Sequence, residues 1–359
     1  MPKILIVGQT GAFNLEGFVS RAFLQVGWDV KRFDIYESSS PFRGLNKYAR
    51  MIATRSKSFR SLLNGLAGIE ERVVALVERE RPDLLLVFKG EVFPPKAARR
   101  ARTELGVKTV LWFPDDPRFL RSLLAAIAPS FDHVLVSSRS TIPFLEGTGV
   151  DSIIHLPFAC DPAVHRTFKM ERTFDVTFVG SYYPERARLL AKLSHLDLKI
   201  WGPYWNLPWI PRSLAKHVMH DGSFGEKLVM IMNRSKIAVN VHHLSDLNAT
   251  GKVNMRVFET AGCGAFQLTD RAIGLGEFFS LGQEIVCYDS PQELIELAEY
   301  YLDSEELRER IAVAGQRRAY SDHTYVKRVR LLLEKTGLSS LTGTQGLTTN
   351  QSRTSGASS

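Results

Sequence analysis

Short apolar runs alternate with amphipathic segments along most of this sequence, and that alternation is typical of parallel α/β structure. The apolar runs end at glycine, proline or aspartate, as buried strands do where they pass into loops. In the first part of the chain the predicted strands are 3–7, 29–33, 84–88, 108–113, 134–137 and 153–156. The helices predicted between them are 15–26, 61–80 and 96–105.

A segment rich in proline and aspartate, 157–162, interrupts the pattern, which then starts again. We predict strands that run into loops within 174–181 and 198–205, and further strands at 237–242, 265–269 and 284–288. The accompanying helices are 184–194, 225–233, 253–261, 291–302, 304–318 and a last helix that ends near 335. The second part of the chain therefore repeats the α/β plan of the first.

The sequence thus predicts two Rossmann-like domains that face each other across a cleft. We place the N-terminal domain at 1–160 and the C-terminal domain at 161–320. A C-terminal helix at 321–337 is expected to cross back to the first domain. The remainder, 338–359, is polar and has no aromatic residue, so we expect a disordered tail.

The composition is that of a soluble globular protein, with 44% hydrophobic and 23% charged residues. No apolar run approaches the ~20 residues that a membrane-spanning helix needs. The N-terminal apolar run turns at Gly8, too early for a signal peptide. The three cysteines, Cys160, Cys263 and Cys287, are widely spaced and lie beside apolar residues, which predicts reduced, buried thiols in a cytoplasmic protein.

The formal net charge is +8, which is compatible with nucleic acid, anionic lipid or a phosphorylated substrate as a partner. A basic segment, 43–60, contains no acidic residue. A solvated helical face explains it, and the alternatives are an anionic acceptor or a peripheral contact with the inner membrane face. No glycine–aromatic RNA-binding signature occurs, so nucleic acid is not an expected partner.

The most informative stretch is 251–270, where a helix with one apolar face runs from 253 to 261 and two glycines then end it. Asn254, Arg256 and Glu259 fall in its first turns. Helix N-terminal amides and a guanidinium suit a diphosphate, and a carboxylate suits ribose hydroxyls. The alternative is an ordinary amphipathic helix with a capping asparagine and a solvated arginine.

Polar residues also follow the first predicted strands, at the edge of the sheet where ligands bind in α/β proteins. The loop after the first strand contains Gly8 and Gly11 but lacks the Gly-x-Gly-x-x-Gly fingerprint of dinucleotide sites. These glycines allow either a tight turn or a close approach of ligand to backbone. The residues that follow the third and fourth strands are Lys89, Glu91, Asp115 and Asp116.

Several motifs together resemble the CgeB-type glycosyltransferases and, more distantly, family 4 glycosyltransferases of the GT-B architecture. The resemblance covers nearly the whole chain apart from the tail. It rests on segments 108–117, 156–162, 175–181 and 254–259, and on the closing His323-Thr324-Tyr325 with Arg328. The family-4 enzymes usually carry a second glutamate eight positions before the one matched by Glu259, and here that position is Gly251.

The resemblance implies a nucleoside diphosphate sugar in the second domain and an acceptor in the first. Glu259 would bind ribose, while Arg186 or Arg256 would supply positive charge to the diphosphate. The other residues that it places around the donor are Gly180, Ser181, Gly202, Pro203, Tyr204, Asn240, His242 and Asn254. The residues expected on the acceptor side are Gly8, Gly11, Lys89 and Glu91.

The expected chemistry needs no metal and no other cofactor, because the sequence has no Asp-x-Asp triplet. Arg256 would stabilise the charge of the departing diphosphate. Asp115 and Asp116 would orient or deprotonate the acceptor hydroxyl, or would cap the helix after Pro117. His242 and its neighbour His243 would bind phosphate or sugar, or would be packed polar residues.

We therefore expect a glycosyltransferase, with retention of configuration as the resemblance implies. Two other functions stay open. A sugar-nucleotide epimerase shares this architecture, and a catalytically silent nucleotide-sugar-binding or scaffold protein of polysaccharide assembly would tolerate the absence of a glutamate at Gly251.

Overall fold

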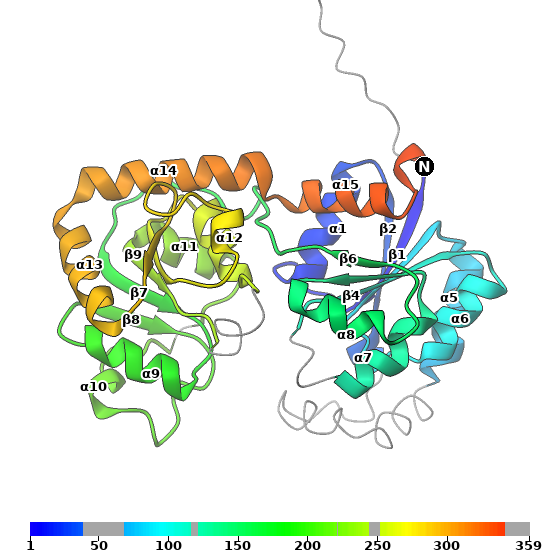
Figure 1. Cartoon of the computed structure of the whole chain (residues 1–359), viewed down its shortest axis with the longest axis horizontal. Coiled ribbons are helices and arrows are strands. Elements are labelled where there is room, and N and C mark those ends of the chain that lie inside the picture. Colours follow the sequence, from blue (N-terminus) through cyan, green and yellow to red (C-terminus); the bar gives the residue numbers. More distant parts are fainter. Residues whose placement is uncertain (39–67, 116–120, 221, 244–251, 342–359) are drawn as a thin grey trace, which may run out of the picture.

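The computed structural model describes residues 1–38, 68–115, 121–220, 222–243 and 252–341. The basic segment 43–60, Asp116, Gly251 and residues 342–359 of the predicted tail lie outside the described residues. The prediction of a disordered tail from 338 is wrong at its start, because Ser339–Leu341 form a short 3-10 helix. Two lobes stand side by side, each built on a parallel sheet (Figure 1).

The first lobe contains a parallel six-stranded sheet with the order β2-β1-β3-β4-β5-β6. Its strands are β1 (Lys3–Gly8), β2 (Asp29–Asp34), β3 (Leu84–Phe88), β4 (Lys108–Phe113), β5 (His133–Val136) and β6 (Ile153–His155). Its helices are α1 (Leu15–Gln25), α2 (Ile35–Ser38), α5 (Ile69–Glu80), α6 (Pro95–Thr103), α7 (Arg121–Ile127) and α8 (Ile142–Glu146).

Continuous apolar strands are expected wherever both faces of a sheet are covered, and β1 shows this directly. Ile4 and Ile6 pack on the side of α1, whereas Leu5 and Val7 pack on the side of α5, α6, α7 and α8. The six predicted strands of this lobe are therefore confirmed as members of one sheet, in which the edge strands β2 and β6 are less buried than the others.

The second lobe contains a parallel five-stranded sheet with the order β11-β10-β9-β7-β8. Its strands are β7 (Phe174–Val179), β8 (Leu198–Trp201), β9 (Ser235–Asn240), β10 (Gln267–Asp270) and β11 (Val286–Tyr288). Its helices are α9 (Pro184–Leu190), α10 (Arg212–Ala215), α11 (Glu226–Arg234), α12 (Met255–Gly262), α13 (Pro291–Asp303) and α14 (Glu305–Asp322). Helix α14 runs beyond the predicted end at 318, because Ala319 is still buried in the core.

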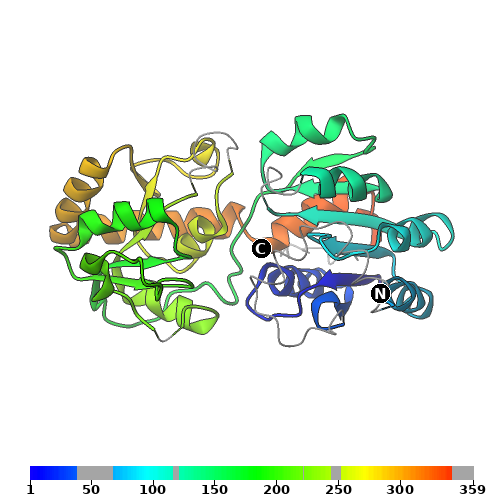
Figure 2. The same cartoon turned by 90° about the horizontal axis from the view of Figure 1, so that it is seen from below.

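The final helix, α15 (Tyr325–Lys335), leaves the second lobe and packs on α1 of the first (Figures 1 and 2). The rings of Tyr325 and Phe18 stack with their centroids 5.6 Å apart. One continuous apolar cluster contains residues of α1, the connecting segment, α12 and α15. The two lobes therefore share part of their core.

The three cysteines are free and buried, as predicted. Burial raises the pKa of the Cys160 thiol to about 12 and that of Cys287 to about 11. These thiols are therefore protonated and unreactive at neutral pH.

Candidate functional site

The predicted donor residues of the second lobe meet at the carboxyl edge of its sheet. Gly180 and Ser181 follow β7, Asn240 ends β9, and Asn254 is the N-cap of α12. The side chain of Asn254 accepts a hydrogen bond from Val257 N–H at 3.2 Å and donates to Asn240 Oδ1 at 3.1 Å. The first turn of α12 is thus fixed to the end of the central strand β9.

Arg256 extends from this turn to the end of β7. Its Nε donates to the carbonyl of Val179 at 3.3 Å, and its Nη1 lies 2.5 Å from Glu259 Oε2. The side chain of Arg256 is only 20% exposed, so the alternative of a freely solvated arginine is wrong. A guanidinium therefore stands next to Gly180, and its contact with a diphosphate stays a prediction.

Glu259 is buried, and both of its carboxylate oxygens face protein partners. Oε2 faces Arg256, and Oε1 lies 3.6 Å from Nε2 of His165. The backbone N–H of Asp161 donates to His165 Nδ1 at 3.0 Å, so the proton of the neutral ring is on Nε2 and points at Glu259. Burial lowers the pKa of His165, which favours that neutral form, although Glu259 and Asp161 act in the opposite direction.

His165 was not predicted as a site residue. It lies in the segment that connects the lobes, far from Glu259 in the sequence, and no local pattern links the two. Only the folded chain brings the connecting segment against α12: an added Cβ on Gly262 would come within 3.0 Å of His165 Cβ.

Arg186 holds the loops after β7 and β9 together. Its Nε and Nη2 donate to the carbonyl of Val241 at 3.0 and 2.7 Å, and its Nη1 donates to the carbonyl of Ser181 at 3.0 Å. Its guanidinium also lies 4.9 Å from the ring centroid of Tyr183. Arg186 therefore shapes the edge of the sheet, and its contact with a diphosphate stays a prediction.

The loop after β8 packs tightly on the loop after β7. At Gly202, where φ is +140°, an added Cβ would lie 2.0 Å from the carbonyl oxygen of Gly180. Trp205 Nε1 donates to the same oxygen at 2.8 Å, and the carbonyl of Pro203 accepts from Tyr182 N–H at 3.0 Å. Tyr204 adopts a left-handed backbone with φ of 72°. These contacts bring two groups of predicted donor residues together, one after β7 and one after β8.

Trp201 and Trp205 are both buried and belong to the core of the second lobe. His243 is partly exposed, with Nε2 3.6 Å from Glu185 Oε1 and its ring against Tyr183. His242 is fully enclosed, and its Nδ1 lies 2.5 Å from Asp270 Oδ1 at the end of β10.

The predicted acceptor residues of the first lobe also gather at the carboxyl edge of their sheet. Lys89 Nζ lies 3.0 Å from Asp115 Oδ2, which brings the ends of β3 and β4 together. Asp115 raises the pKa of Lys89 most, and Glu91 raises it further. Lys89 has a left-handed backbone with φ of 62°, which turns the chain sharply after β3.

Glu16, in the first turn of α1, belongs to the same edge and was not predicted. An added Cβ on Gly8 would come within 3.0 Å of its Cγ, so the glycine makes room for this side chain. Its Oε1 accepts from Gln9 N–H at 3.4 Å. Burial raises the pKa of Glu16, and the charges of Lys89 and Arg32 oppose that effect. From sequence alone, a glutamate here is indistinguishable from one that simply complements the helix dipole.

Close packing within the loop also explains Gly11. An added Cβ there would lie 2.8 Å from Asn14 Cγ, and Asn14 caps α1 by accepting from Gly17 N–H at 2.9 Å. The tight-turn interpretation of this glycine therefore suffices. The tip of the same loop reaches the second lobe, because the ring of Phe13 lies within 2.9 Å of the Cβ position of Gly225.

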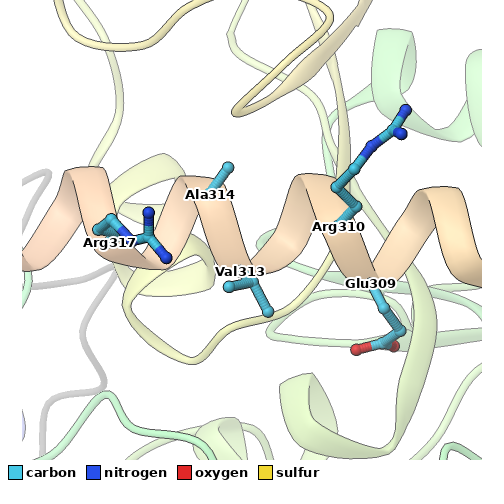
Figure 3. Close-up of a pocket in the computed structure, with 5 residues that line it drawn as sticks. All are labelled: Glu309, Arg310, Val313, Ala314 and Arg317. Carbon is cyan, nitrogen blue, oxygen red and sulfur yellow. The ribbon is translucent and has the colours of Figure 1, made fainter.

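A surface depression lies along the outer side of α14, far in the sequence from every predicted site residue (Figure 3). Its lining is Glu309, Arg310, Val313, Ala314 and Arg317. All five come from one helix, so the depression is a gap between neighbouring side chains, and we assign no role to it.

In the described part of the chain, no group of three or more His, Cys, Asp or Glu side chains is placed to hold a metal ion. Within the same residues, no helix has both the length and the apolarity to cross a membrane.

Residues 184–334 match the family described as Glycosyl transferase-like. The matched segment is less than half of the chain and lies in the second lobe and α15. The match includes α12, with Arg256 and Glu259, and reaches almost to the end of α15.

The predicted resemblance to CgeB is confirmed by a curated relative of this chain. The spore protein CgeB of Bacillus subtilis (strain 168) is 24% identical over an alignment of 268 residues, which covers 69% of this chain and 81% of that protein.

The predicted GT-B architecture is confirmed by solved structures. Sucrose-phosphate synthase from Thermosynechococcus elongatus superposes with a TM-score of 0.66 at 10% identity, covering 95% of this chain and all of that one. HepE from Anabaena, in complex with UDP and glucose, superposes with a TM-score of 0.63 at 14% identity, covering 94% of this chain and all of that one. At such low identity these similarities show the fold alone.

Proposed function

We propose that this protein transfers a sugar from a nucleoside diphosphate sugar to an acceptor hydroxyl, without a metal ion and with retention of configuration. The observation that supports this best is the Arg256–Glu259 pair at the start of α12, beside the end of β7 and inside the segment that matches the family. HepE, which has a similar fold, has been crystallised with UDP, with UDP and glucose, and with UDP-glucose.

The proposed chemistry follows from where charge develops. The bond between the sugar's anomeric carbon and the β-phosphate oxygen breaks, and its electron pair stays on that oxygen. A fixed guanidinium and helix N-terminal amides stabilise such charge without reorganising. Arg256 and the first turn of α12 provide both groups, which removes the need for a divalent cation.

The acceptor is proposed to bind at the carboxyl edge of the first sheet. Asp115 would orient or deprotonate the attacking hydroxyl, and Lys89 holds its carboxylate at 3.0 Å. Glu16 and Glu91 add acidic groups to this edge, which suits the hydroxyl groups of a carbohydrate.

A thermal-shift screen of nucleoside diphosphates and their sugars tests the donor. A compound present at about 100 times its Kd stabilises the native state by about 2.7 kcal/mol, which is easily detected. Transfer from the selected donor is then followed by mass spectrometry, with and without a chelator.

Each outcome has a distinct meaning. Binding followed by chelator-insensitive transfer supports the proposal. Release of an altered free sugar without an acceptor indicates an epimerase, and binding without turnover indicates a silent nucleotide-sugar-binding protein. Failure of every nucleotide and nucleotide sugar to bind contradicts the proposal.

A further inference from the structure

The ring of His242 is enclosed at the carboxyl end of β9, yet one of its nitrogen atoms has no partner. The side chain is fully buried, and among the described residues Nε2 has no hydrogen-bond partner. A buried polar atom without a partner destabilises the native state, so such atoms call for an explanation. One explanation is a ligand that supplies the missing partner.

Asp270 determines which hydrogen bond Nε2 can make. Its Oδ2 accepts from the backbone N–H of His242 at 2.8 Å, and its Oδ1 lies 2.5 Å from His242 Nδ1. A carboxylate only accepts hydrogen bonds, so Nδ1 carries the proton. When the imidazole is neutral, Nε2 therefore carries a lone pair and acts as a hydrogen-bond acceptor.

Asn240 does not compete effectively for Nδ1. Its Nδ2 lies 3.4 Å from that atom, whereas it donates to Thr269 Oγ1 at 2.9 Å. Asn240 also accepts from Asn254, the N-cap of α12. The imidazole is thus held rigidly beside the same helix turn from which Arg256 extends.

A hydrogen-bond acceptor at Nε2 needs a ligand group that donates a hydrogen bond. The oxygens of a diphosphate are themselves acceptors, and Arg256 and the α12 amides suit them. A sugar hydroxyl carries a proton that it can donate. We propose that His242 Nε2 accepts a hydrogen bond from a hydroxyl of the transferred sugar, and that Asp270 is the positioning residue that keeps Nε2 an acceptor. This inference rests on the proposed donor, a nucleoside diphosphate sugar.

The test compares each nucleotide sugar with its nucleoside diphosphate by titration calorimetry, using UDP-glucose with UDP, GDP-mannose with GDP and ADP-glucose with ADP. In His242→Phe, which keeps a flat ring and removes the acceptor, we expect a roughly 5- to 100-fold weaker affinity for the nucleotide sugar. Affinity for the diphosphate alone should stay within about twofold, because it contains no transferred sugar.

Asp270→Asn tests the positioning role. The carboxamide NH₂ donates to Nδ1 and moves the proton to Nε2, so the acceptor is lost although His242 remains. The same selective loss for the nucleotide sugar is expected. The control is His195→Gln, whose exposed ring pairs with Glu299 and should change neither affinity.

The proposal is overturned if the variants lose affinity equally for the nucleotide sugar and for the nucleoside diphosphate. It is also overturned if either His242→Phe or Asp270→Asn binds the nucleotide sugar with unchanged affinity. If the variants do not fold, deoxy analogues of the bound nucleotide sugar on the unmodified protein decide instead. Removal of one particular sugar hydroxyl should weaken binding by a similar factor. If no deoxy analogue binds more weakly, the contact with His242 is refuted. If the unmodified protein binds none of the nucleotide sugars, the proposed function itself fails, which is a different result.

Discussion

Arg256 carries the main electrostatic role proposed for the donor side. Its guanidinium is held by Val179 and Glu259, and Glu259 is in turn faced by His165. A charge fixed in this way stabilises a leaving group better than a mobile one, because no reorganisation is needed during the reaction.

Replacing Arg256 by alanine should lower kcat by roughly 10²–10³-fold, the usual cost of removing one donor to a developing oxyanion. Arg256→Lys should recover part of the rate, since it keeps the charge but loses the planar fork. Steady-state rates with the donor found in the binding screen measure this. Arg271→Ala is the control, because Arg271 pairs with Asp289 at the surface. An unchanged rate in Arg256→Ala would show that this guanidinium does not contact the leaving group.

Glu16 gives a prediction about pH. Burial raises the pKa of Glu16 in the native state above its ordinary value of 4.5. At a pH between the ordinary value and the native-state pKa, the native state therefore binds more protons than the unfolded state. Stability contributed by this group is therefore lost as the pH rises through that interval. In Glu16→Gln the loss disappears, so the variant should gain stability relative to the unmodified protein as the pH rises from 4.5 toward neutrality. Urea unfolding across this range measures the difference, and parallel curves for the two proteins would contradict it.

At the scale of single elements, the exits of the strands determine the shape of the site. The loops after β7 and β8 can approach each other only because Gly202 has no side chain and adopts φ of +140°. The same closeness allows Trp205 to donate to Gly180 from the far loop.

Gly202→Ala should destabilise the protein by roughly 2–4 kcal/mol, since the methyl group would collide with a backbone oxygen in a backbone conformation that alanine avoids. Gly276→Ala is the matched control, because its Cβ position is open and its backbone needs no glycine. Thermal unfolding of both variants measures the difference. Equal melting temperatures for the two variants would mean that the two loops separate at little cost.

The elements were predictable from sequence where local pattern decides them. Buried parallel strands such as β3 are unbroken apolar runs, and α12 has a capping asparagine before it, a glycine as its last residue and another glycine, Gly264, shortly after it. The partners of Glu259 and of His242 were not predictable, because His165 and Asp270 meet them only through tertiary packing. Glu16 was missed for the same reason: its enclosure depends on Gly8 and on residues of neighbouring strands.

At the scale of the whole molecule, the two lobes are joined by more than the connecting segment. Arg21 of α1 pairs with Asp161 at 2.6 Å, and Arg139 pairs with Glu277 at 3.2 Å. Tyr325 of α15 stacks on Phe18 in the shared core. This shared core predicts that the lobes unfold together.

Tyr325→Ala should cost roughly 3–5 kcal/mol, the usual range for a buried aromatic ring, and should separate the unfolding of the lobes into two transitions. Tyr325→Phe is the matched comparison and should be nearly neutral, because the buried hydroxyl has no hydrogen-bond partner among the described residues. Calorimetry distinguishes one transition from two. A single transition in Tyr325→Ala would show that other contacts hold the lobes together.

The path of α15 also bears on biosynthesis. The ribosome releases the strands of the first lobe early, but the helix that covers α1 is made only after the whole second lobe. Until then the nascent protein exposes the apolar side of α1, including the ring of Phe18 that later stacks on Tyr325. Such a surface invites chaperones and aggregation, so the first lobe reaches its final stability only after translation of the second is complete.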